Sequence, residues 1–212
     1  MVTPTVTHHA ALLDPAKVGK LLRDVDGYAG SVITRLALQL APHLLARPGE
    51  LRKAKWEEFD LDAGIWRMTA HRMKARRAHA VPLSKQALEY LAELATLTGP
   101  AGYLFPATGK PNVPMSENTM NQGLKRLGYS SAEVTPHGLR TTGSTLLNES
   151  SKWHPDAIER ALAHGDSDVV RGIYNRGQYS EERVRIMQWW SDYLDQLRQG
   201  AKSFSGEITP HG

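Results

Sequence analysis

Six polar side chains, dispersed along the chain, have the types that phosphate chemistry uses. They are two arginines, a lysine, two histidines and a tyrosine: Arg47, Lys74, His137, Arg140, His164 and Tyr174. Together they provide cations for a phosphate, groups for proton transfer and a nucleophile, which is what breaking a phosphodiester bond without a metal ion requires. No single residue is diagnostic, but the ordered set predicts this chemistry.

The two arginines are the candidate phosphate ligands. A guanidinium never deprotonates at neutral pH, and its planar fork makes two charge-assisted hydrogen bonds to a phosphate. Arg47, in "ARPGEL", follows an apolar helix and precedes a helix that Pro48 can begin. Arg140, in "TPHGLR", would share a helix face with His137 if Pro136 begins a helix there. The alternative for either arginine is an ion pair at the surface.

His137 and His164 are candidates for proton transfer, because imidazole titrates near physiological pH. Other histidines are interpreted as structural or exposed: His8, His9, His154 and His211. A zinc site is the competing interpretation. However, no HxxxH or HExxH pair occurs, and the histidines lack carboxylates at ligand spacing. We therefore expect no metal and no cofactor.

The stretch from Ile65 to Lys85 carries basic side chains and no Asp or Glu. Its Lys and Arg residues are Arg67, Arg72, Lys74, Arg76, Arg77 and Lys85. Such a local basic stripe, in a chain of net charge +4, favours a polyanion partner, DNA or RNA. Lys74 could protonate a leaving oxygen, whereas Arg72, Arg76 and Arg77 are expected to contact phosphates without chemistry. The alternative is a solvated basic hairpin.

Tyr174 is the candidate nucleophile. A phenol has a pKa of about 10, so it needs neighbouring cations and a base to attack as phenoxide. The guanidiniums and a histidine of the same set could provide both. The alternative is a tyrosine packed in a core, and Tyr179, five residues later, competes for the same role.

The composition is that of one globular unit. The chain has 212 residues, 41% of them hydrophobic, and no cysteine, so it uses neither disulfides nor a thiolate zinc site. We find no apolar run long enough to cross a membrane and no signal peptide at the N-terminus. These features fit a cytoplasmic protein with no membrane partner.

The elements that must position these residues are mainly helical, which predicts an α+β fold with one small antiparallel sheet. The sheet is expected over residues 56–83, with Arg72 to Arg77 as an exposed turn before its last strand. Helices are expected from Pro15, over the apolar stretch ending near Pro42, and then over 84–96, 116–127, 138–149, 155–163 and 181–198. Residues 98–114 are expected to be a Pro/Gly-rich surface connection.

In order, Arg47, Lys74, "HGLR", "LAH" and a tyrosine ten residues after that histidine resemble the active-site signature of the tyrosine recombinases. The flanking "RPGELRKAKWEEFDLDAGIWRM", "RMKARRAHAVPLS" and "YNRGQYSEERVRIMQWWSDYLDQL" are similar to prophage and genomic-island integrases of that family. The resemblance runs from about His9 to Leu197. It implies a catalytic domain over residues 13–200, between a flexible lead-in (1–12) and a flexible tail (201–212).

The resemblance also implies a role for each residue. Arg47 and Arg140 would clamp the scissile phosphate, and His164 would add a hydrogen bond. Lys74 would protonate the departing 5′-oxygen, His137 would assist proton transfer, and Tyr174 would form a 3′-phosphotyrosine link. Glu50 matches an acidic position that supports the site from behind Arg47. The implied partner is double-stranded DNA at an attachment site.

The chain also departs from the family's pattern. Such integrases carry DNA-binding domains ahead of this part, so we expect a fragment, an excised domain or a truncated relic. His43 and Leu44 stand where relatives often have Thr or Gly. Two other functions remain open: relaxation of supercoils, as by a type IB topoisomerase, and a non-catalytic DNA-binding remnant of a mobile element.

The last helix carries an apolar stripe at spacings of three and four: Val184, Met187, Trp190, Leu194 and Leu197. In the family such a tail docks on a neighbouring protomer and builds a tetramer on DNA. The alternative is that the stripe packs on its own domain.

Overall fold

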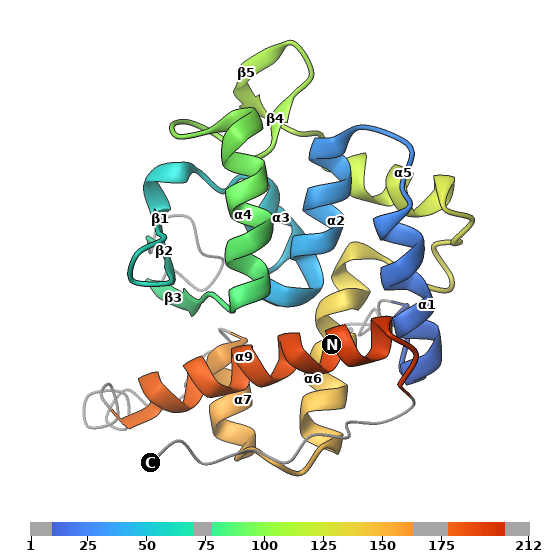
Figure 1. The fold of residues 1–212 in the computed structure, drawn as a ribbon, viewed down its shortest axis with the longest axis vertical. Helices are drawn as coiled ribbons and strands as arrows, with labels where there is room; N and C mark the ends of the chain where they lie inside the picture. Colours follow the sequence, from blue (N-terminus) through green and yellow to red (C-terminus); the bar gives the residue numbers. More distant parts are fainter. Residues whose placement is uncertain (1–9, 70–77, 163–177, 202–212) are drawn as a thin grey trace, which may run out of the picture.

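The fold is a helical body with two small antiparallel sheets at its side, in a computed structural model that describes residues 10–69, 78–162 and 178–201 (Figure 1). The described helices are α1 (Pro15–Asp26), α2 (Val32–Leu44), α3 (Pro48–Arg52), the short 3₁₀ helix η1 (Trp56–Glu58), α4 (Lys85–Thr98), α5 (Thr119–Arg126), α6 (Pro136–Glu149), α7 (Pro155–Ala161) and α9 (Gln178–Arg198). The α+β, mainly helical class expected from the sequence is confirmed, with helix ends shifted by up to three residues.

Local signals explain several helix starts. Asp14 caps α1 by accepting a hydrogen bond from the Ala16 N–H at 2.9 Å, and Pro15 occupies the first turn. Thr135 caps α6 in the same way by accepting from the Gly138 N–H, with Pro136 following. The first start is the predicted one, whereas α6 begins two residues before the expected start at residue 138.

The expected sheet is present within residues 56–83. Its strands are β1 (Phe59–Asp60), β2 (Ile65–Met68) and β3 (His79–Pro82), antiparallel in the order β1-β2-β3. Trp66 of β2 pairs with Val81, Met68 pairs with His79, and the Trp66 ring stacks on Phe59. The predicted turn at Arg72 to Arg77 lies outside the described residues.

A second sheet, within the expected Pro/Gly-rich surface connection over residues 98–114, corrects the prediction of one small sheet. Strands β4 (Pro106–Ala107) and β5 (Lys110–Pro114) form an antiparallel hairpin. Gly109 permits its turn by adopting a φ of 70°. Because β5 is mostly exposed and contains two prolines, its sequence lacks the apolar alternation that identifies a strand.

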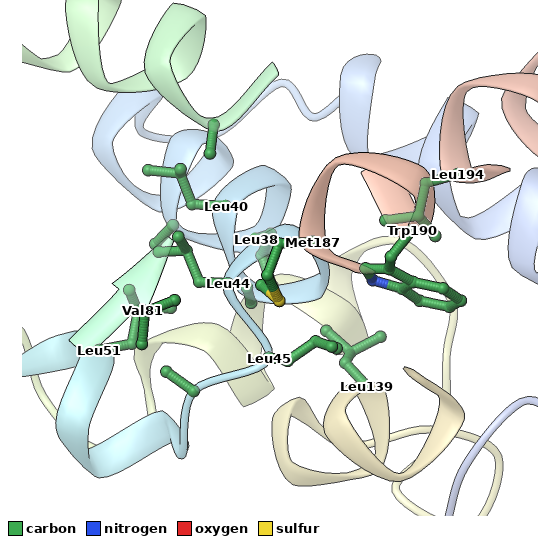
Figure 2. Close-up of a cluster of buried hydrophobic side chains, with 14 of the residues drawn as sticks. Leu38, Leu40, Leu44, Leu45, Leu51, Val81, Leu139, Met187, Trp190 and Leu194 are labelled. Atoms are coloured by element: carbon green, nitrogen blue, oxygen red, sulfur yellow. The ribbon is translucent and has the colours of Figure 1, made fainter. Parts of the chain in front are cut away.

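Helix α2 lies at the centre of the body, and its buried leucines join the sheet side to the helix side (Figure 2). Leu40 and Leu44 face Leu51 and Val81, whereas Leu45 lies beside Leu139 of α6. Helix α9 closes the other side by packing on α1, α2 and α7. This core fixes the ends of α2, α6 and β3 relative to one another.

The stripe of α9 packs on its own domain. Met187, Trp190, Leu194 and Leu197 are fully buried here, and the Trp190 indole N–H donates to the Pro42 carbonyl at 2.7 Å. Val184 is different, because 51% of its surface is exposed. Apart from Val184, these residues therefore follow the expectation that the stripe packs on its own domain.

The expected lead-in is described only from Ala10, and residues 10–12 pack on the helical body. The Ala10 carbonyl accepts from the Thr135 N–H, and the Leu12 carbonyl accepts from the Thr142 hydroxyl. A side chain in place of Gly138 would meet the Ala10 carbonyl, since its Cβ would lie 1.8 Å from that oxygen. The packed part of the chain thus begins before residue 13, and the rest of the expected division into domains stays a prediction.

No helix within the described ranges is both long enough and apolar enough to cross a bilayer.

Candidate active site

Arg140 lies in the first half of α6 and is almost fully buried, with 5% of its surface exposed. One terminal nitrogen of its guanidinium donates to the Leu45 carbonyl and the other to the Leu162 carbonyl. Burial, and next the positive charge of Arg47, lower the pKa of Arg140 from 12.5 to about 10, so it stays charged at neutral pH. Each terminal nitrogen carries a second N–H, so the same guanidinium can also donate to a ligand.

Arg47 and Glu50 form the second part of the site. Arg47 precedes α3, and its Nη1 lies 2.8 Å from the Glu50 carboxylate. The other oxygen of Glu50 accepts from the Arg47 backbone N–H at 3.0 Å. Glu50 is 7% exposed and Arg47 is 24% exposed. The buried carboxylate therefore holds a guanidinium that remains accessible.

A close contact between α2 and α6 brings the two arginines together. Leu45 ends α2 in the left-handed conformation, at φ 50°, and its side chain lies over Gly143 of α6. A Cβ on Gly143 would lie 2.3 Å from the Leu45 side chain. Arg47 follows Leu45 by two residues and Arg140 precedes Gly143 by three, so this contact sets their separation.

His79 belongs to the same neighbourhood, although the sequence analysis did not select it. It begins β3, where it pairs with Met68 of β2. Burial, then the charges of Arg183, Arg140 and Arg47, lower the pKa of His79 to about 4. The strand pattern "HAVPL" predicts β3 but gives no sign of these neighbouring charges.

Of the other residues that the sequence analysis named, the structure describes His137 and His154. His137 lies half-buried in the first turn of α6, three residues before Arg140, as expected. His154 caps α7 by accepting from the Asp156 N–H, which confirms a structural role. Six predicted residues lie outside the described residues: Arg72, Lys74, Arg76, Arg77, His164 and Tyr174.

His43, a departure from the family's pattern, belongs to the core. Its Nδ1 lies 2.9 Å from the Ser191 hydroxyl of α9, which itself lies 2.7 Å from the Ser84 hydroxyl that caps α4. Burial lowers the pKa of His43 to about 3, so the ring is neutral. The replacement near Arg47 therefore links α2 to α9 rather than entering the site.

The described site concentrates positive charge around a buried carboxylate. Within the described ranges, no three His, Cys, Asp or Glu side chains are placed to hold a metal ion. Two guanidiniums that share one neighbourhood can bind a dianionic or monoanionic phosphate and stabilise charge that develops on its oxygens.

Known proteins match this chain over nearly its full length. Residues 12–181 match the phage integrase family. The integrase of Enterobacteria phage P4 is 38% identical over 211 residues, which cover 93% of this chain and 48% of that protein. Prophage integrase IntA of Escherichia coli K12 is 40% identical over 187 residues, covering 88% and 45%. The chain thus spans about half the length of these relatives.

Solved structures share the fold. The integrase from mycobacterium phage Brujita superimposes with a TM-score of 0.64 at 17% identity, over 93% of this chain and 65% of the other. A lambda integrase dimer bound to a COC′ core site gives 0.58 at 19% identity, over 98% of this chain and 54% of the other. With the matches in sequence, these findings make the chain a member of the phage integrase family of tyrosine recombinases.

Proposed function

We propose that this chain is the catalytic domain of a site-specific DNA recombinase that cuts and rejoins DNA through a 3′-phosphotyrosine intermediate. The observation that carries the proposal is the pairing of Arg47 and Arg140, which are far apart in sequence and adjacent enough in space for one to lower the pKa of the other. Glu50 offsets part of the positive charge of this pair, and a bound phosphate would offset the rest.

In the proposed reaction Arg47 and Arg140 hold the scissile phosphate between α3 and α6. The Tyr174 oxygen attacks phosphorus and forms the new ester bond, while the bond to the 5′-oxygen breaks. Lys74 gives its proton to that departing oxygen, and His164 donates a hydrogen bond to the phosphate. His137 assists proton transfer by accepting the phenol proton that Tyr174 loses. Rejoining is the reverse reaction, in which the 5′-hydroxyl attacks the phosphotyrosine, so the bond energy is conserved.

The proposed partner is double-stranded DNA at an attachment site, contacted in part by Arg72, Arg76 and Arg77. Support comes from the relatives: one solved structure is a lambda integrase dimer on a core site, and another is the integrase of transposon Tn1549 in complex with circular intermediate DNA. We further propose that the full-length protein assembles as a tetramer on DNA and acts in the cytoplasm. The integrase names of the relatives favour strand exchange over relaxation of supercoils.

The test is a nicked suicide duplex that carries the attachment core of the element encoding this chain. Incubation should give a covalent protein–DNA adduct on a denaturing gel, and peptide mapping should place the link at Tyr174. Tyr174→Phe should abolish the adduct, whereas Tyr179→Phe should retain it. An adduct at Tyr179 would keep the reaction and overturn the assignment of the nucleophile. If DNA binds but no adduct forms, with this chain and with the full-length protein alike, the catalytic proposal fails.

A further inference from the structure

The C-terminal end of α2 is held from outside by α9. The last carbonyls of a helix have no partner within the helix, so they must bind something else. The Pro42 carbonyl is one of these, and it accepts from the Trp190 indole N–H of α9 at 2.7 Å. This hydrogen bond is shielded from water, because no part of the Trp190 side chain is exposed.

The next residue of each helix makes a second buried link. The Nδ1 atom of His43 lies 2.9 Å from the Ser191 hydroxyl, which donates to the Ser84 hydroxyl at 2.7 Å. Because Ser191 gives its single proton to Ser84, it accepts from His43, so Nδ1 carries a proton. Ser84 also accepts from the Ala87 N–H as the cap of α4. A chain of hydrogen bonds thus joins the end of α2, the middle of α9 and the start of α4.

The end of α2 leads directly into the candidate active site. A connection of three residues, 45–47, separates α2 from α3. The Leu45 carbonyl accepts from Arg140, and the Arg47 carbonyl accepts from the Glu50 N–H at 2.9 Å, in the first turn of α3. Both ends of this short connection are therefore fixed, and a shift of the end of α2 would displace the two guanidiniums relative to each other.

We propose that His43 is a positioning residue, whose hydrogen bond to Ser191 sets the end of α2 so that Arg47 and Arg140 bind one phosphate. This rests on the proposed DNA cleavage. His43 touches no substrate in this role, since it is 3% exposed, and it acts through residues 45–47. Apolar packing is non-directional, whereas a hydrogen bond weakens steeply when it is misaligned, so the link fixes the orientation of the helix end.

The experiment uses the whole chain and the nicked attachment-core duplex described above. His43→Leu removes the donor, and His43→Asn keeps an N–H donor close to the position of Nδ1. Ser191→Ala removes the acceptor from the side of α9. Thr98→Val is the matched control, because it removes a hydroxyl that donates to the Leu104 carbonyl at 2.9 Å, at the opposite end of α4 from Ser84.

We expect His43→Leu and Ser191→Ala each to slow single-turnover cleavage at saturating DNA roughly tenfold to a hundredfold. The double variant should be no slower than the slower single variant, because both changes remove the same hydrogen bond. His43→Asn should recover most of the rate, and Thr98→Val should cleave at the parental rate per folded molecule. DNA affinity should stay close to the parental value in every variant.

Amide hydrogen exchange gives a second readout that does not depend on cleavage. The Arg47 N–H donates to the Glu50 carboxylate at 3.0 Å, and the Leu51 N–H donates to the Arg47 carbonyl at 3.0 Å. These two amides therefore report on the start of α3. In His43→Leu their exchange should accelerate more than that of the buried Leu94 in α4, whereas in His43→Asn it should stay parental.

Several outcomes would overturn the proposal. Parental cleavage by His43→Leu or by Ser191→Ala would remove the positioning role. Additive losses in the double variant, or equal acceleration of exchange at Arg47 and Leu94, would make His43 structural only. If His43→Leu does not fold, the same two measurements on Ser191→Ala decide the question. If the parent forms no adduct, the proposed cleavage fails, and the exchange data alone decide whether His43 positions Arg47.

Discussion

Arg140 uses its guanidinium to hold two backbone segments, one leading to Arg47 and one leaving α7. An ammonium could keep the charge, but it cannot span two carbonyls and a phosphate in the plane of a fork. Arg140→Lys should therefore lower the free energy of unfolding by on the order of 2 kcal/mol and abolish adduct formation. Urea denaturation and the suicide substrate measure the two effects. Arg35→Lys, in an exposed pair with Glu93, is the control, and equal stability of both variants would contradict the expectation.

Glu50 supports the site through its hydrogen bonds with Arg47. Glu50→Gln replaces one acceptor by an amide donor, which then faces the N–H groups of Arg47. We expect a loss of about 1–2 kcal/mol in unfolding free energy and slower cleavage, because Arg47 loses its support. The matched change Glu93→Gln breaks an exposed pair and should cost under about 0.5 kcal/mol. Similar losses in the two variants would show that burial of Glu50 adds nothing.

A buried histidine, His43, and a half-buried one, His79, should make the fold sensitive to acid. Burial lowers the pKa of His43 to about 3 and that of His79 to about 4, from 6.5. The unfolded chain binds these protons at higher pH than the folded chain does. Stability from these groups is therefore full above pH 6.5 and is lost as pH falls toward 4, by about 1.4 kcal/mol per pH unit for each histidine.

Urea denaturation across that pH range tests the expectation. His43→Leu should remove the contribution of one histidine to the pH dependence of the unfolding free energy. The double change with His79→Leu should remove the contributions of both. An unchanged dependence in His43→Leu would mean that this ring is not the group that titrates.

At the scale of elements, the contact of α2 with α6 sets the separation of Arg47 and Arg140. Gly143→Ala would place a Cβ 2.3 Å from the buried side chain of Leu45. We expect a loss of about 1–3 kcal/mol from overpacking. Gly49→Ala, in the nearby α3 with nothing within 4 Å of the added methyl, should be neutral or slightly stabilising. Chemical denaturation compares the two, and a neutral Gly143→Ala would show that α6 can shift freely.

The sequence predicts those elements whose limits depend on neighbouring residues. The helix from Pro15 begins with a local hydrogen bond to Asp14, and the expected sheet lies within residues 56–83. The hairpin of β4 and β5 was not predicted, because its strands lack apolar alternation and are held by a glycine turn.

Contacts between distant segments explain the rest of the difference. The residue types and order indicate Arg47, Arg140 and Glu50, and the structure places all three together. The surroundings of His79 include charges from distant segments, Arg183, Arg140 and Arg47, which the strand pattern around His79 does not reveal. Likewise, the sequence alone indicates only that His43 is an unusual residue near Arg47. In the structure its hydrogen-bond partner is Ser191 of α9.

At the scale of the whole molecule, α9 completes the core. Trp190 fills the space between α2 and α9, so Trp190→Ala should cost about 3–5 kcal/mol. Val184→Ala on the same helix should have little effect on stability, since that side chain is exposed. Thermal unfolding measures both changes. If Trp190→Ala unfolds at the parental temperature, α9 is not needed for the core.

This arrangement also changes how self-association should be tested. A cut after Gln178 would remove the buried stripe and expose the core, so any change in assembly would reflect unfolding. Val184→Glu alters only an exposed position of the helix, and sedimentation of that variant on DNA is the better measurement.

The contact between the first and last helices has a consequence for synthesis of the protein. Gly19 of α1 lies against the Leu197 carbonyl, and Arg23 donates to the Arg198 carbonyl at 2.9 Å. The ribosome adds about 5–20 residues per second, so α1 is synthesised well before α9. The contact between the two helices cannot form until α9 has been made. A frameshift anywhere before α9 should therefore yield a chain that proteases remove, rather than an inactive competitor that occupies the DNA.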